Sequence, residues 1–188
     1  MNAIAITSTI TTEELFALPD DGIERDLIRG ELREYPITRR SRLHSEVMMA
    51  VGEVLRRWVR TCNRGGRVPG GEAGARLRRE PETTVGMDVA YFSAESIAQM
   101  PSDQGWYEGP PVLAVEILSP SDTHENVVEK INLYLECGVA VVWILDPDFQ
   151  TLTVYRPNSL PLMLRSNETL DGYPELPGLS APVQDFFN

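Results

Sequence analysis

Three ionisable side chains near the middle of the chain differ in kind from the residues around them. Lys130 is the only lysine among 17 basic residues, and the other 16 are arginines. Glu116 is the single charge in the apolar run PVLAVEIL (111–118), and Asp88 is the single charge in VGMDVAYF (85–92). A carboxylate in a buried strand is costly unless it is protonated, paired or bound to a cation. Two such carboxylates supply the oxygen ligands that a hard cation such as Mg²⁺ requires.

Lysine offers this group a chemistry that arginine cannot. Lys130 lies on a predicted helix directly after the Glu116 strand, at the flank of its buried face and beside Tyr134. From there its flexible stem can reach the C-terminal end of the strand. Lysine is a compact cation whose pKa can fall on burial, whereas arginine stays protonated. Such an ammonium can orient or deprotonate a water, or offset charge on a phosphorane transition state.

Local signals predict the N-terminal elements that would frame these residues. Thr11-x-x-Glu14 is a capping box for a short helix ending near Pro19, and residues 23–37 predict a hairpin with Arg29-Gly30 at or near its turn. A long helix is expected over about Ser41–Cys62, ended by Gly65-Gly66. Its apolar face consists of Leu43, Val47, Val51, Val54, Leu55 and Trp58.

The remainder of the chain predicts strands that alternate with one helix. Residues 75–80 and 83–92 are expected to pair, 94–110 to form a loop, and 111–118 and 139–147 to be buried strands. Ser121 or Asp122 should cap the intervening helix, and Gly138 should end it. Residues 151–157 are expected to form an edge or hairpin strand, and the Pro-rich tail 172–187 to wrap the surface. The order predicts one α/β domain over residues 1–188, with a mixed central sheet flanked by helices and an extra N-terminal hairpin.

Charge and composition limit the classes of partner. The net charge is −11, but residues 1–80 hold 14 Arg against 12 acids, and residues 81–188 hold three basic residues against 16 acids. Nucleic-acid contacts are therefore expected from the Arg-bearing half, unless its arginines only balance local acids on a solvated face. Those arginines are Arg39, Arg40, Arg42, Arg56, Arg57, Arg60, Arg64 and Arg67.

No membrane or secretory signal is evident in the sequence. The longest apolar run, Val139 to Leu145, is far too short to span a bilayer, and the N-terminus lacks a basic region before a hydrophobic stretch. Cys62 and Cys137 show no metal-ligand spacing. They indicate reduced thiols in a cytoplasmic protein, with a single disulfide left open as an alternative.

Motifs in order along nearly the whole chain resemble the Uma-type family within the PD-(D/E)XK nuclease superfamily. They include EELFALPDDGIERDLIRGEL, LHSEVMMAVGEVL, MDVAYFSAE, GPPVLAVEILSPSDT, EKINLYLECGV, VWILDP, TVYRP and LPGLSAPVQDFF. The resemblance implies a restriction-endonuclease-like fold and hydrolysis of DNA phosphodiester bonds by metal-activated water. It further implies Mg²⁺ or Mn²⁺ as cofactor and, by analogy and from the small size of one domain, a homodimer.

The resemblance also assigns the site residues. Asp88 matches the family's first acid, Glu116 its second acid and Lys130 its lysine, with Asp88, Glu116 and the Ile117 carbonyl as metal ligands. Two positions depart from the superfamily pattern. Met87 stands where proline usually precedes the first acid, and Leu118 stands where the lysine usually follows the second acid. A lysine moved to the next helix, at Lys130, would compensate.

Structural explanations remain open for each of these residues. Asp88 can cap a turn, Glu116 can pair with Arg76 or Arg78, and Lys130 can be a solvated lysine near Glu125 and Glu129. His44 is expected as a hydrogen-bonded core or cap residue, with an assisting role as the alternative; Glu46 and His124 are expected to face solvent. Two other functions compete: a nuclease-fold binding or regulatory module without turnover, and a glycosidase that uses Asp88 and Glu116 and has no role for Lys130.

Overall fold

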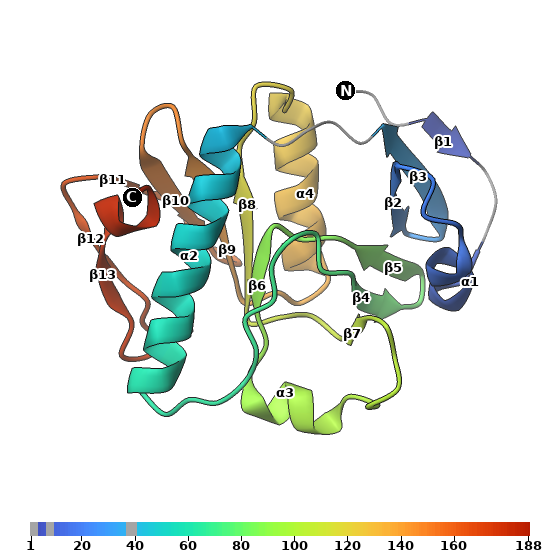
Figure 1. Ribbon diagram of the computed structural model, residues 1–188, viewed down its shortest axis with the longest axis horizontal. Helices are drawn as coiled ribbons and strands as arrows, with labels where there is room; N and C mark the ends of the chain where they lie inside the picture. The colour runs from blue at the N-terminus through green and yellow to red at the C-terminus, as the bar shows by residue number, and fades with distance from the viewer. Residues whose placement is uncertain (1–3, 7–9, 37–40) are drawn as a thin grey trace.

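The computed structural model describes residues 4–6, 10–36 and 41–188, which form two main β-sheets (Figure 1). Within these residues the five-stranded sheet has the order β11-β10-β9-β8-β6, and the six-stranded sheet has the order β1-β3-β2-β5-β4-β7. The strands of the first are β11 (Leu162–Arg165), β10 (Thr151–Tyr155), β9 (Val141–Asp146), β8 (Leu113–Ile117) and β6 (Val89–Tyr91). Those of the second are β1 (Ile4–Ile6), β3 (Glu31–Pro36), β2 (Ile23–Ile28), β5 (Glu82–Val85), β4 (Ala75–Arg79) and β7 (Tyr107–Glu108).

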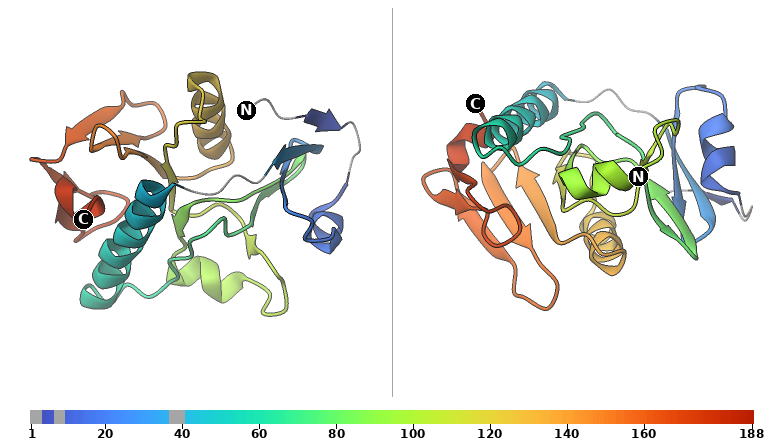
Figure 2. Two further views of the ribbon diagram at one scale, coloured as in Figure 1. Left: turned by 45° about the horizontal axis from the view of Figure 1, so that its top comes forward. Right: turned by 90° about the horizontal axis from the view of Figure 1, so that it is seen from below.

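The five-stranded sheet is mixed and carries a helix on each face, as the sequence predicts. β8 and β9 are parallel, whereas β6, β10 and β11 pair antiparallel with their neighbours. Helix α2 (Arg42–Thr61) covers one face and α4 (His124–Glu136) covers the other, most clearly in the right-hand view of Figure 2. Because both faces are covered, every residue of β8 is buried, which explains why its sequence is apolar except for Glu116.

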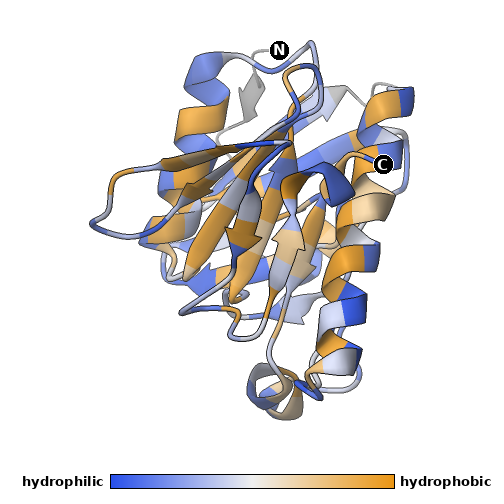
Figure 3. Ribbon diagram, turned by 90° about the vertical axis from the view of Figure 1, so that its left-hand side faces the viewer, coloured by the Kyte–Doolittle hydropathy of each residue, from blue (hydrophilic) through white to orange (hydrophobic). Residues whose placement is uncertain are grey.

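Helix α2 forms where the 3.6-residue periodicity predicts it. Ser41 caps it, since its hydroxyl accepts a hydrogen bond from the His44 amide, and Cys62 follows its last turn. Figure 3 shows the hydrophobic stripe of α2 turned toward the sheet and its hydrophilic residues turned outward. One position differs from the expected stripe: Leu43 is 41% exposed, and the neighbouring His44 is buried instead.

Helix α4 also lies where expected, but its predicted cap is wrong. Thr123, and neither Ser121 nor Asp122, is the N-cap, and its side chain accepts a hydrogen bond from the Asn126 amide. The Asp122 carboxylate instead accepts from the Ser119 amide and fixes the turn that leaves β8. Gly138, with φ of 95°, follows the helix as predicted. In the part of the chain that the structure describes, no helix is both long and apolar enough to cross a membrane.

The expected N-terminal hairpin is β2–β3, and it belongs to the six-stranded sheet rather than standing apart. Arg29 and Gly30 both have positive φ, at 53° and 84°, which matches the twist of a two-residue hairpin turn. Helix α1 (Thr12–Ala17) precedes it, and both hydrogen bonds of the predicted capping box at Thr11 and Glu14 are present. Cys62 and Cys137 are free thiols, so the alternative of a disulfide is wrong.

Two predictions between residues 83 and 110 are wrong. The stretch 83–92 is not one strand but two, because the chain leaves the six-stranded sheet after Val85 and enters the five-stranded sheet at Val89. Asp88 lies in this crossing rather than within a strand. The predicted loop 94–110 contains a short helix, α3 (Ala94–Gln99), and strand β7, which pairs in parallel with β4.

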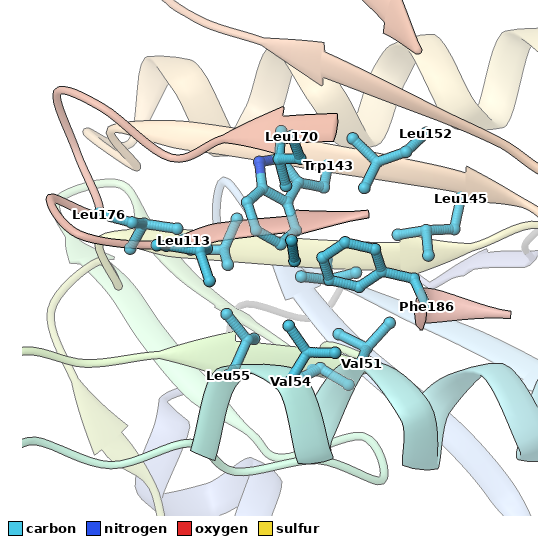
Figure 4. Packing of buried hydrophobic residues seen from close by; sticks show 14 of the residues in the cluster. Val51, Val54, Leu55, Leu113, Trp143, Leu145, Leu152, Leu170, Leu176 and Phe186 are labelled. Atoms are coloured by element: carbon cyan, nitrogen blue, oxygen red, sulfur yellow. The ribbon is translucent and has the colours of Figure 1, made fainter. Parts of the chain in front are cut away.

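The Pro-rich tail is part of the core and does not merely wrap the surface. It forms β13 (Ser180–Pro182), which pairs with β12 (Thr169–Asp171), and a short 3₁₀ helix, η1 (Val183–Phe186). Five of its side chains are buried in the cluster beneath α2, and Leu170 just before the tail joins them: Leu176, Leu179, Ala181, Val183 and Phe186. Figure 4 shows Phe186 between α2 and Trp143, and the two ring centroids are 5.7 Å apart.

Replacing Phe186 by alanine is expected to lower the free energy of unfolding by about 3–5 kcal/mol, since a large side chain would leave a cavity. Phe186 has no exposed surface, whereas Phe149 is 80% exposed. Phe149→Ala is therefore the matched control, and it should change stability by less than about 0.5 kcal/mol. Urea denaturation of both variants measures the difference. Equal stabilities would show that the tail does not contribute to the core.

Candidate active site

Asp88 and Glu116 face each other where the two sheets meet. Val89 pairs with Val115 in the antiparallel register of β6 and β8, so the next position along places Asp88 beside Glu116. The Asp88 carboxylate accepts a hydrogen bond from the Ile117 amide, with an O···N distance of 2.8 Å. Ala114 and Leu118 pack in the cluster on the α4 side of the sheet, as the predicted alternation requires for the Glu116 side chain.

Helix α4 holds both oxygens of the Glu116 carboxylate. Lys130 Nζ lies 2.8 Å from Glu116 Oε2, and the Tyr134 hydroxyl donates to Glu116 Oε1. Lys130 and Tyr134 are four residues apart and therefore lie on one face of the helix. The Lys130 side chain is 37% exposed and the Glu116 side chain 11%, so the ion pair is partly accessible to solvent from the lysine side.

These contacts exclude two of the structural alternatives. Glu116 pairs with Lys130 and not with Arg76, whose guanidinium binds Glu13, Glu82 and Glu108. Lys130 is not a solvated helix lysine beside Glu129, because Glu129 pairs with Arg33 at 2.7 Å.

His44 is the hydrogen-bonded core histidine that the sequence predicts, and it also reaches Asp88 of the candidate site. It is a buried core residue, only 1% exposed, and its Nε2 lies 3.1 Å from Asp88 Oδ1. It therefore orients the Asp88 carboxylate from helix α2, while the Ile117 amide holds the other oxygen. Burial raises the pKa of Asp88, but the hydrogen bonds from His44 and Ile117 outweigh it and hold this pKa below its ordinary value.

Glu116 and Lys130 form a partly buried ion pair, in which burial and the neighbouring charges shift the pKa of each partner in opposite directions. Burial raises the pKa of Glu116, and repulsion from Asp88 adds to that effect against the attraction of Lys130. Burial lowers the pKa of Lys130, but the charges of Glu116, Tyr134, Asp26 and Glu72 raise it well above its ordinary value. Lys130 is therefore a cation at neutral pH in the metal-free protein, which favours charge stabilisation over proton abstraction.

Glu72 is a neighbouring acid that the sequence did not reveal. It is half-buried in the connection before β4, with φ of 60°, and it packs against Gly86, where an added Cβ would lie 2.8 Å from Glu72 Oε2. Burial, followed by the charges of Asp88 and Glu116, raises its pKa to about 9. No periodic pattern marks an acid in a Gly-rich connection, so only the tertiary fold places it here.

Asp26 on β2 is a second missed acid, and it is 4% exposed. Its Oδ1 accepts a hydrogen bond from the Gly86 amide at 3.1 Å, while the Gly86 carbonyl oxygen lies 3.4 Å from the Tyr134 hydroxyl oxygen, whose proton is donated to Glu116. Burial raises the pKa of Asp26 to about 6, although Lys130 and the Gly86 amide act in the opposite direction. The signal in the sequence is the position of Asp26 directly before the apolar pair Leu27-Ile28, but Glu24 and Arg25 precede it and obscure that signal.

The raised pKa of Asp26 predicts a dependence of stability on pH. Between about pH 4 and pH 6 the folded protein binds a proton at Asp26 more readily than the unfolded chain, so the free energy of unfolding should fall as pH rises, by about 3 kcal/mol for this group. Asp26→Asn stays neutral and can still accept from Gly86, so it should lack this fall. Urea denaturation across the window compares the two proteins, and parallel pH profiles would contradict the assignment.

The remaining sequence candidates lie away from this group. Glu46 is exposed and pairs with Arg42 at 3.0 Å, and His124 is exposed, as predicted for both. Arg39 and Arg40 lie outside the described residues. Arg56 and Arg67 contact the main-chain carbonyls of Val68 and Gly66, respectively.

The donor set suits Mg²⁺ better than a cation that needs an all-protein cage. Among the residues that the structure describes, no three His, Cys, Asp or Glu side chains are arranged to hold a metal ion. Mg²⁺ is commonly bound by one or two carboxylates, with waters and substrate phosphate completing its octahedron. Each carboxylate oxygen of Asp88 and Glu116 has two lone pairs, so an oxygen that accepts one of the contacts named above can still bind a cation. A cation between them would also offset the repulsion that raises the pKa of Glu116 and Glu72.

Comparisons with known proteins agree with this fold. A crystal structure from Anabaena variabilis, described as a "putative nuclease", superimposes with a TM-score of 0.76 at 23% sequence identity, and the match covers 95% of this chain and 97% of that chain. No protein of curated function matches the sequence. The profile of the Uma2 family, described as "Putative restriction endonuclease", matches residues 12–184. The chain therefore belongs to the Uma2 family, which is the family that its motifs predicted.

Proposed function

We propose that the protein is a Mg²⁺- or Mn²⁺-dependent endonuclease that hydrolyses DNA phosphodiester bonds. The observation that carries this proposal is the meeting of two carboxylates and one ammonium at the end of β8, where Asp88, Glu116 and Lys130 come from three separate elements. Membership of a family described as a restriction endonuclease supports the same reaction.

Asp88 and Glu116 would hold the divalent ion, together with the Ile117 carbonyl. When bound, such an ion polarises the phosphate and lowers the pKa of a coordinated water. His44 and the Ile117 amide fix the Asp88 carboxylate, so that its remaining lone pairs have one orientation. Lys130, fixed through Glu116, presents a positive charge beside the two carboxylates, and this charge would offset the negative charge that develops on a phosphate in the transition state.

Asp26, with a pKa of about 6, adds negative charge around this pair at neutral pH, whereas Glu72, with a pKa of about 9, is mostly protonated there. Asp26, Asp88 and Glu116 then face one lysine, and a phosphate anion is repelled by such a group unless a cation is present. The raised pKa values of Glu72 and Asp26, about 9 and about 6, reflect the same crowding and burial. We infer that the scissile phosphate enters the site only after a divalent cation is bound, whereas contacts of the DNA outside the site do not require the cation.

A nuclease-fold binding or regulatory protein without turnover is the second candidate. It is favoured by the ion pair between Lys130 and Glu116, since a lysine held at 2.8 Å by a would-be metal ligand partly neutralises that ligand. A glycosidase is disfavoured, because Glu116 is held by both Lys130 and Tyr134 and these contacts have no role in that reaction.

A plasmid-nicking assay tests the proposal. Supercoiled DNA should be converted to the nicked form in Mg²⁺ or Mn²⁺ and remain intact in EDTA. Analytical ultracentrifugation of the same sample tests the proposed homodimer, which would present two sites to the two strands of a duplex. DNA binding without nicking in either metal would favour the binding module over the endonuclease.

A further inference from the structure

A groove lined by arginines lies beside the C-terminal half of α2. It has a volume of about 270 Å³ and is bounded by α2 on one side and by residues 66–69 on the other. Arg56, Arg60 and Arg67 line it, and its apolar walls are Val59, Val68, Pro69 and Tyr107. In Figure 1 the segment that follows α2 runs from the end of this helix toward β4.

These three arginines differ from most others in the described part of the chain, because no described carboxylate pairs with any of them. Arg56 donates to the Val68 carbonyl at 3.3 Å, and Arg67 donates to the Gly66 carbonyl at 3.3 Å. Seven other arginines pair with acids at 3.3 Å or less: Arg25, Arg29, Arg33, Arg42, Arg76, Arg79 and Arg156. In a protein of net charge −11, adjacent arginines without acid partners indicate a site for an external anion.

We propose that this groove binds the sugar-phosphate backbone of the DNA strand that enters the candidate active site. The inference rests on the proposed function and adds the path of its substrate. Guanidinium groups bind phosphate oxygens through two parallel hydrogen bonds, and they tolerate apolar surroundings better than ammonium groups. Backbone contacts of this kind position a strand without reading its sequence.

The main chain connects the groove to the site by a short extended path. Arg67 pairs with Phe92 and Gly70 pairs with Val89, so residues 67–70 run antiparallel beside β6. Phe92 is four residues from Asp88, which is about 13 Å of extended chain.

The test compares DNA binding by a groove variant and by a matched control. The groove variant carries Arg56→Gln, Arg60→Gln and Arg67→Gln. The control, Arg165→Gln, removes an exposed arginine on β11 whose side chain has no acid partner among the described residues. Fluorescence anisotropy of a labelled DNA duplex in EDTA, over a series of salt concentrations, gives affinity without cleavage, and circular dichroism checks that each variant is folded.

The groove variant should lose about 2–3 units from the slope of log K against log[salt], and at least about tenfold in affinity near 0.1 M salt, whereas Arg165→Gln should match the wild type. Unchanged binding by the groove variant, an equal loss in Arg165→Gln, or no DNA binding by the wild type would each overturn the proposal. Nicking is scored separately: a wild type that binds through the groove but does not nick would leave the groove intact and reject the proposed hydrolysis.

Discussion

Glu116→Gln is expected to lower the rate of Mg²⁺-dependent plasmid nicking by about 10³-fold. Glutamine keeps the size of the side chain but removes the negative charge, so the site loses one of its two proposed metal ligands. The change also removes the partner of Lys130, which lies 2.8 Å from the carboxylate. Initial rates of conversion from supercoiled to nicked plasmid, at saturating Mg²⁺, measure the loss.

Glu46→Gln provides the matched control for this substitution. Glu46 is exposed on α2 and pairs only with Arg42 in the described structure, so its loss should leave nicking unchanged and alter stability by less than about 0.5 kcal/mol. Nicking by Glu116→Gln at the wild-type rate would reject the assignment of the site. Thermal unfolding of both variants separates a loss of catalysis from a loss of the fold.

Lys130→Arg is expected to reduce nicking by about 10²-fold although it preserves the charge. Lys130 fits between Glu116 and the solvent as a compact point charge, whereas a guanidinium is planar and larger and would displace the carboxylate or the hydroxyl of Tyr134. Lys130→Met should lose as much or more, because it keeps the stem and removes the charge altogether. Single-turnover nicking rates of the two variants and the wild type measure both effects.

Arg33→Lys is the reciprocal control, since it exchanges the same two residue types in a peripheral ion pair with Glu129. It should nick DNA at the wild-type rate. Wild-type activity in Lys130→Arg would show that any cation suffices at this position, and the solitary lysine of the sequence would then need another explanation. Wild-type activity in Lys130→Met would remove Lys130 from the mechanism.

The elements with strong local signals were predictable from the sequence. Helix α2 has a cap, the β2–β3 hairpin has a turn pair, and β8 has an apolar run interrupted only by Glu116. Each of these elements lies within a few residues of its predicted bounds. The predictions that were wrong concern segments whose structure depends on tertiary contacts. The crossing between β5 and β6 has no proline to mark it, and the tail is buried by tertiary packing that its Pro-rich composition conceals.

Part of the candidate site also follows from local patterns in the sequence, and part of it does not. Strand alternation placed Glu116, and the helical wheel placed Lys130, so their contact follows from two short-range rules. Tyr134 was recognised as a neighbour of Lys130 but not as a donor to Glu116. Glu72 and Asp26 approach only because the six-stranded sheet packs at the end of the five-stranded one, and no pattern within a single element carries that information.

Gly86 stands at the junction of these groups, and its lack of a side chain has a mechanical consequence. Its amide donates to Asp26 of one sheet, its carbonyl oxygen lies 3.4 Å from the Tyr134 hydroxyl on the helix behind the other, and Glu72 fills the space where a Cβ would be. The two sheets are thus buttressed through a single residue a short step from Asp88. A cation that draws Asp88 and Glu116 together should therefore stiffen both sheets at once. Amide hydrogen exchange in β2 and in β8 should then slow together.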